Sequence, residues 1–150
     1  MSYAHQNEFT RIEGEFEDVK ELLESYARAG KRTKKRLRNI DSGNIESALA
    51  TANDAYALLL IATAERFLRA YLTSQGIRLP AGPNPGRWID QCRNVFNSSV
   101  PQNPIRLNDA REMHNLREKR NAYAHGQSRS VFPSVRKVTE MLGRFFDHLP

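Results

Sequence analysis

The segment from residue 45 to residue 74 is the feature that most constrains the fold. It runs for thirty residues without a glycine or a proline. Its middle, Ala55–Ala64, reads AYALLLIATA and is apolar on more than one side. A helix that is apolar all round has to be covered by other elements. The sequence therefore predicts a long central helix over Ile45–Ser74, with Asn44 as its N-cap.

Four further segments have helical patterns. The first, Phe9–Tyr26, has apolar residues at alternating intervals of three and four, which predicts one buried stripe on a helix. Two more long helices are expected over Leu107–Ala124 and Ser134–Leu149, and a short one over Arg87–Phe96. No segment alternates as a strand does. We expect an all-α fold, a single domain over residues 1–150 built as a bundle of four long helices plus one short helix.

The connections between these helices are marked by composition. Residues 76–86 (GIRLPAGPNPG) hold three glycines and three prolines and predict a loop. A second loop is expected over residues 97–106. The connector over residues 31–38 (KRTKKRLR) has six basic residues in eight positions: Lys31, Arg32, Lys34, Lys35, Arg36 and Arg38.

Two interpretations of this basic connector are open. In one it contacts nucleic-acid phosphates, and in the other it is a solvated surface that keeps the protein soluble. The net charge of +6 favours a polyanionic partner only modestly. No aromatic residue lies within the run, so stacking on bases is not indicated.

Composition also bounds the chemistry and the compartment. The single cysteine, Cys92, cannot form an internal disulfide or a cysteine-based zinc site, and no His/Asp/Glu spacing indicates a metal. We therefore expect no metal and no cofactor. The N-terminus is polar and acidic, and no apolar run approaches the roughly 20 residues that cross a bilayer. The expectation is a soluble cytoplasmic protein that does not enter a membrane.

The segment Leu116–Gly126 (LREKRNAYAHG) carries the most unusual placement of a charge. At about 100° per residue, Arg120 lies on the apolar side of its helix with Leu116 and Tyr123. An unpaired guanidinium there is costly, so Arg120 requires a carboxylate, a bound anion or an interface. Glu65, on the central helix, is the best candidate within the chain. Tyr123 is expected in the core or at an interface.

The opposite, polar side of this helix carries the candidate catalytic groups. His125, at its end, is the strongest of them, with Asn121 beside it. His114 lies on the same side and would extend an anion-binding surface. His5, close to the N-terminus, is a weaker candidate, in a segment expected to fray.

In this segment the chain resembles the HEPN superfamily. Arg120-Asn121-Ala-Tyr-Ala-His125 matches the R-x4-H motif of that family, including the Asn that often follows the Arg. The layout is similar as well, with a glutamate on the second helix (LLLIATAERFLRAYL) and the motif on a late helix. The specific part of the resemblance is about ten residues long.

The resemblance implies a metal-independent endoribonuclease. Two copies would pair so that their motifs line one cleft. Arg120 would hold the scissile phosphate, His125 would act as general base or acid, and Asn121 would orient the imidazole or bind the phosphate. Attack by the 2′-OH would give a 2′,3′-cyclic phosphate. Lys31–Arg38 and Arg117 would bind the RNA, and Glu65 would support the site.

The partners implied are RNA, a second copy of the chain and, in a toxin–antitoxin setting, an antitoxin or a nucleotidyltransferase. Phage defence and RNA processing are the other settings. Gln127 stands where a toxin subgroup has a modifiable tyrosine, which argues against that form of regulation. Two alternatives stay open: an inactive HEPN module that dimerises or binds nucleotide or RNA, and a nucleic-acid binder that acts through Lys31–Arg38.

Overall fold

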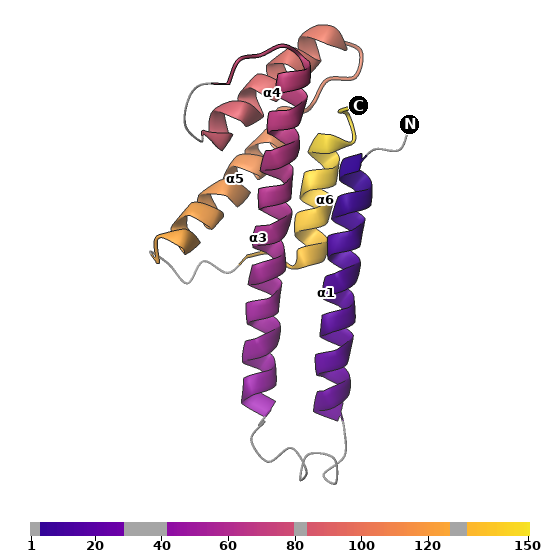
Figure 1. The fold of residues 1–150 in the computed structure, drawn as a ribbon, viewed down its shortest axis with the longest axis vertical. Coiled ribbons are helices and arrows are strands. Elements are labelled where there is room, and N and C mark those ends of the chain that lie inside the picture. Colours follow the sequence, from indigo (N-terminus) through magenta and orange to yellow (C-terminus); the bar gives the residue numbers. More distant parts are fainter. Residues whose placement is uncertain (1–3, 29–41, 80–83, 127–131) are drawn as a thin grey trace.

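The computed structural model describes residues 4–28, 42–79, 84–126 and 132–150. Over these ranges the chain is all-helical, as the sequence predicts. The helices are α1 (Ala4–Arg28), α3 (Ser42–Ser74), α4 (Pro85–Ser99), α5 (Leu107–Ala124) and α6 (Val135–Phe146). Figure 1 shows α1 and α3 as a long antiparallel pair, with the start of α1 and the C-terminus of the chain near one end of it.

The central helix α3 organises the bundle, because it packs against each of the other four helices. In Figure 1, α6 lies beside α1 and α3. Helix α5 crosses α3 at an angle, and α4 lies across the C-terminal end of α3. Three completely buried leucines lie in the second half of α3: Leu60, Leu68 and Leu72. They join the buried faces of the other helices in one hydrophobic core. The segment Ile45–Ser74 is long and apolar because it packs against several helices at once.

By length and composition, the stretch Asn44–Ser74 also meets the criteria for a membrane-crossing helix. A central helix of a bundle meets the same criteria, and this one packs on all four other helices. It also carries Glu65, Arg66 and Arg69 in its second half. The pattern is therefore not a clear membrane span.

Several helix boundaries differ from the sequence prediction. Helix α3 begins at Ser42, so Asn44 lies inside the helix and is not its N-cap. The helix expected to be short, α4, has 15 residues, whereas α6, with 12, is the shortest of the helices that the structure describes. The loop predicted over 76–86 therefore loses Pro85 and Gly86 to α4, and the loop over 97–106 loses residues 97–99.

Specific hydrogen bonds extend α4 at both ends. The Asn84 side chain accepts from the N–H of Arg87 at 3.3 Å, and Pro85 occupies the first turn, where its missing N–H costs nothing. At the other end, Asn97 Oδ1 accepts from the N–H of Ile105 at 2.7 Å, and its Nδ2 donates to the carbonyl of Ile105 at 3.2 Å. These side-chain contacts hold the following loop against a helix that continues to Ser99.

Helix α6 is fixed to α3 through Asn53. Its Nδ2 donates to the carbonyl of Pro133 at 3.1 Å, and its Oδ1 accepts from the N–H of Val135 at 3.0 Å. Ser134 caps the helix by accepting from the N–H of Lys137. The apolar face of α6 is fully buried and consists of Val135, Val138, Leu142, Phe145 and Phe146.

Two leucines test the role of α3 in the core. Leu60 on α3 is completely buried, whereas Leu22 on α1 is 72% exposed. We expect Leu60→Ala to lower the free energy of unfolding by about 2–5 kcal/mol, through lost burial and the cavity it leaves. The matched variant Leu22→Ala should change it by less than about 0.5 kcal/mol. Urea unfolding followed by circular dichroism measures both, and equal effects would contradict this core.

Candidate functional site

Helix α5 places Arg120 on the side of the helix that faces the bundle. Met113 lies two turns and Leu116 one turn earlier on the same side, and they are buried at 5% and 1% exposure. At this helical spacing, Arg120 is the next residue on the same buried side of α5, and its side chain is 31% exposed. A guanidinium in this position needs a partner, as the sequence indicates.

Glu65 supplies that partner. Arg120 Nη2 donates to Glu65 Oε1 at 2.6 Å, and the Glu65 side chain is only 20% exposed. A hydrogen bond between two charged groups is shorter and stronger than a neutral one. Burial raises the pKa of the Glu65 carboxyl, and the charges of Arg120 and Arg117 partly oppose the rise. The pair thus joins α5 to α3 at a half-buried point.

His125 lies outside this pair. It is the C-cap of α5, where its backbone N–H donates to the carbonyl of Asn121 at 3.0 Å, and the residue is exposed. His125 is five positions after Arg120, which places the two side chains about 140° apart around the helix axis. Arg120 points to α3 and His125 to solvent. Within one copy the two groups of the R-x4-H motif therefore leave α5 in different directions.

Glycine ends α5 where the sequence predicts. Gly126 has φ of +63°, a left-handed conformation that other residues adopt at a cost. This turn ends the helix directly after His125 and leaves the imidazole at a helix terminus. Asn121 is half-buried one turn earlier.

The surroundings of three further side chains bear on the sequence expectations. Tyr123 is 42% exposed, which excludes the core and leaves an interface as the prediction; its ring lies 5.7 Å from that of Phe132. His114 Nε2 lies 2.8 Å from Asp90 Oδ1 on α4, and its part in an anion-binding surface stays a prediction. His5 is not in a frayed end, because it lies in α1 and is 4% exposed.

The basic connector, with Lys31, Arg32, Lys34, Lys35, Arg36 and Arg38, lies outside the described residues. Arg117 is described: its guanidinium lies where a Cβ at Gly86 would be, and its charge lowers the pKa of Glu65. No group of three or more His, Cys, Asp or Glu residues suited to a metal occurs in the described ranges. The Cys92 thiol is buried, which raises its pKa to about 12, and its Sγ lies 3.6 Å from the Leu68 carbonyl, so it is a core residue.

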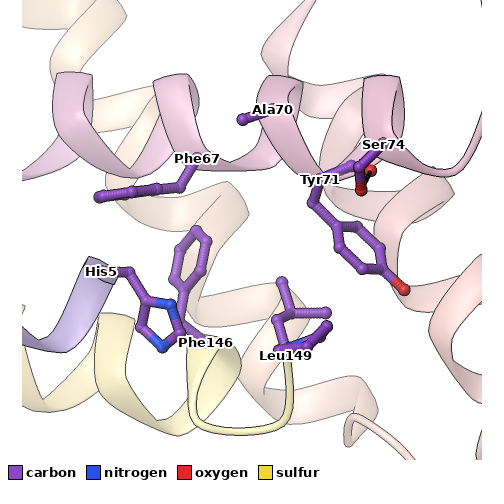
Figure 2. Close-up of a pocket in the computed structure, with 8 residues that line it drawn as sticks. His5, Phe67, Ala70, Tyr71, Ser74, Phe146 and Leu149 are labelled. Atoms are coloured by element: carbon purple, nitrogen blue, oxygen red, sulfur yellow. Dashed lines mark hydrogen bonds between the residues drawn. The ribbon is translucent and has the colours of Figure 1, made fainter. Parts of the chain in front are cut away.

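A separate pocket of about 220 Å³ lies near the chain termini. Figure 2 shows its wall, with His5 and Phe146 facing Phe67 and with Tyr71 at the other end. Burial lowers the pKa of His5, with a smaller opposing effect of Asp147. Phe67 and Glu65 are two residues apart on α3 and so project about 200° apart. This aromatic pocket is therefore on the other side of α3 from the Arg120–Glu65 pair.

Comparisons of the chain with protein-family models, with curated proteins and with solved structures found no match. The functional assignment therefore depends on the residues of this chain and on its resemblance to the HEPN motif.

The Arg120–Glu65 pair can be tested by its pH dependence. Replacing Arg120 with Gln removes the charge that opposes the effect of burial, so the pKa of Glu65 rises further. An acid whose pKa is raised by folding favours the folded state at low pH and loses that contribution as the pH rises. We expect Arg120→Gln to cost about 1.5–3 kcal/mol of unfolding free energy at pH 8, and less at pH 5.

The control is the double variant Arg120→Gln/Glu65→Gln, measured by urea unfolding at both pH values. It has no carboxyl at this position, so titration of residue 65 makes no contribution to its own unfolding free energy. A cost of Arg120→Gln that is the same at pH 5 and pH 8 would contradict a raised pKa of Glu65.

Proposed function

We propose that the chain is a metal-independent endoribonuclease of the HEPN type, and that its site is formed where two copies meet. The observation that carries the proposal is the placement of the R-x4-H motif. Arg120 is held by Glu65 on the bundle side of α5, while His125 ends the same helix and is exposed. The motif also lies on a late helix of an all-helical chain.

Each group has a chemical role in this proposal. The Arg120 guanidinium presents several fixed N–H donors to the scissile phosphate and stabilises the charge that develops on its oxygens. His125 exchanges a proton with the ribose 2′-OH or the leaving 5′-oxygen, because an imidazole can both accept and donate a proton. Asn121 orients the imidazole or binds the phosphate. The 2′-OH attacks the phosphorus, the 5′-oxygen leaves, and the products are a 2′,3′-cyclic phosphate and a 5′-OH.

The divergence of Arg120 and His125 within one copy supports a composite site. Two side chains that leave one helix about 140° apart do not converge on the same phosphate without help. A two-fold arrangement brings a second motif to the cleft and doubles its positive charge. RNA and a second copy are the partners in this proposal, and Lys31–Arg38 would add contacts to the RNA backbone. We place the activity in the cytoplasm, in toxin–antitoxin function, phage defence or RNA processing.

The alternative is an inactive HEPN module that dimerises or binds nucleotide or RNA. The ion pair between Arg120 and Glu65 favours it, because that contact by itself accounts for an arginine on the bundle side of α5. The position of His125 as C-cap likewise suits a purely structural role, since a cation is stabilised near exposed helix carbonyls.

Cleavage of a mixed RNA substrate in EDTA separates the two functions. We expect the wild type to cut RNA without added metal, to leave 2′,3′-cyclic phosphate ends and to spare DNA of the same sequence. His125→Ala should lose at least about 100-fold in rate, because general acid–base catalysis contributes that much. His114→Gln, on the same helix but paired with Asp90, is the matched control and should cut as the wild type does.

A wild-type protein without RNase activity, or a His125→Ala variant that cuts at the wild-type rate, would remove this mechanism. Product ends mapped by gel and mass spectrometry distinguish the cyclic phosphate from the products of a contaminating nuclease.

The composite site makes a prediction about assembly. We expect a homodimer at tens of micromolar, with α5 at or near the two-fold axis, because each copy presents only one arginine and one histidine of the motif. Light scattering measures the mass directly. A monomer that cuts RNA at concentrations where no dimer forms would contradict the composite site.

A further inference from the structure

The aromatic pocket is built from three parts of the chain that meet only in the fold. Its eight lining residues come from the first turn of α1, from the C-terminal part of α3, and from the end of α6 with the tail that follows it: His5, Phe67, Ala70, Tyr71, Ser74, Phe146, Leu149 and Pro150. Three of them, Ala70, Ser74 and Pro150, are exposed. The pocket is therefore open to solvent on one side, where a small molecule can enter.

Aromatic rings form much of the pocket wall. The ring centroids of Phe67 and Phe146 lie 6.4 Å apart, and the centroid of the His5 ring lies 6.0 Å and 5.6 Å from them. Figure 2 shows the ring of Tyr71 at the other end of the pocket, with Leu149 between it and Phe146. Aromatic groups attract one another in edge-to-face or offset-stacked arrangements. Walls of this kind favour a flat aromatic ligand over an aliphatic one.

The side chains that line the pocket carry no charge at neutral pH. None of the eight residues, all of which the structure describes, is an aspartate, a glutamate, a lysine or an arginine. Burial lowers the pKa of His5, against a smaller effect of Asp147, so its imidazole is neutral at pH 7. Burial, and to a lesser extent Cys92, raises the pKa of the Tyr71 hydroxyl, which stays protonated. A charged ligand would lose its hydration here without gaining a counter-charge, so the pocket favours an uncharged one.

Tyr71 offers the ligand a polar contact. Its hydroxyl makes no hydrogen bond to any residue that the structure describes, and a phenol both donates and accepts. The hydroxyl of Ser74, by contrast, already donates to the backbone carbonyl of Tyr71 at 2.7 Å. A single polar atom in the ligand is thus enough to match what this end of the pocket provides.

The volume of the pocket sets the size of the ligand. The pocket measures about 220 Å³. An apolar cavity of about 150 Å³ holds one benzene ring, and this pocket is roughly half as large again. Two fused rings, as in indole, exceed benzene by a similar proportion.

We propose that this pocket binds a small, uncharged heteroaromatic molecule of two fused rings with one hydrogen-bonding ring atom. The rings lie between Phe146 and Tyr71, and the ring heteroatom bonds to the Tyr71 hydroxyl. The site is separate from the proposed ribonuclease site, because the pocket and the Arg120–Glu65 pair are on different sides of α3. The inference therefore goes beyond the proposed function and does not depend on it.

The test is an NMR titration of the full chain with indole. It follows the methyl signals of Ala70 and Leu149, which the ring current of a bound aromatic molecule displaces. Cyclohexanol, which has no flat ring, and adenine, which has several polar ring atoms, are the comparison probes. The variants are Ala70→Phe, which fills the pocket, and Tyr71→Phe, which removes the hydroxyl. Ala62→Phe is the matched control, because Ala62 is exposed on the same helix and lies outside the pocket.

We expect indole to bind the wild type and Ala62→Phe saturably and with the same affinity. Ala70→Phe should lose at least about tenfold in affinity, because its ring takes the space of the ligand. Tyr71→Phe should bind indole about threefold to tenfold more weakly, because a neutral hydrogen bond is lost. Cyclohexanol and adenine should bind the wild type about threefold or more weakly than indole, since the first lacks aromatic contacts and the second leaves polar atoms unpaired.

Three results would overturn the inference: no saturable binding of indole to the wild type, equal affinity of the wild type and Ala70→Phe, or tighter binding of cyclohexanol or adenine than of indole. If Ala70→Phe loses its helical circular dichroism, Tyr71→Phe decides, because it keeps the aromatic ring. Weaker binding of indole to Tyr71→Phe then supports the site, and wild-type affinity overturns it. A loss of RNA cleavage in His125→Ala bears only on the ribonuclease, so the two proposals fail separately.

Discussion

The packing of α3 against all four other helices is the constraint on which the rest of this structure depends. The completely buried leucines in its second half form the middle of the core, and Asn53 in its first half fixes the start of α6. Glu65 lies on the same rigid helix, so the ion pair with Arg120 is made from a well-supported position. Helix α3 therefore contributes both the buried leucines of the core and the carboxylate that pairs with Arg120 of α5.

The charges around Glu65 connect stability with function. One carboxylate that is raised in pKa by burial faces two guanidiniums, and only one of them bonds to it. A structural role of the Arg120–Glu65 pair is compatible with the proposed catalytic role of Arg120, because Glu65 fixes the position of the guanidinium.

Much of the helical framework could be predicted from local patterns. Helix α5 has the bounds that its sequence indicates, because a proline shortly before it and Gly126 after it act on the backbone directly. The buried face of α6 follows from apolar spacing alone. The position of Arg120 among apolar residues required a partner, and Glu65 was the candidate that the sequence offered. Roles in catalysis depend on a resemblance of about ten residues and stay proposals.

Other features depend on contacts between residues far apart in the chain, which local pattern does not contain. Helix α4 is longer than predicted because Asn97 bonds to the backbone of Ile105, and His5 is buried because α1 packs on α6. Arg117 meets Gly86 only because α4 and α5 pack together. The sequence by itself determined which segments are helical and which faces they bury, since spacing and helix ends are local. Only the tertiary structure decided which charges meet, because electrostatic pairing depends on distances that the fold sets.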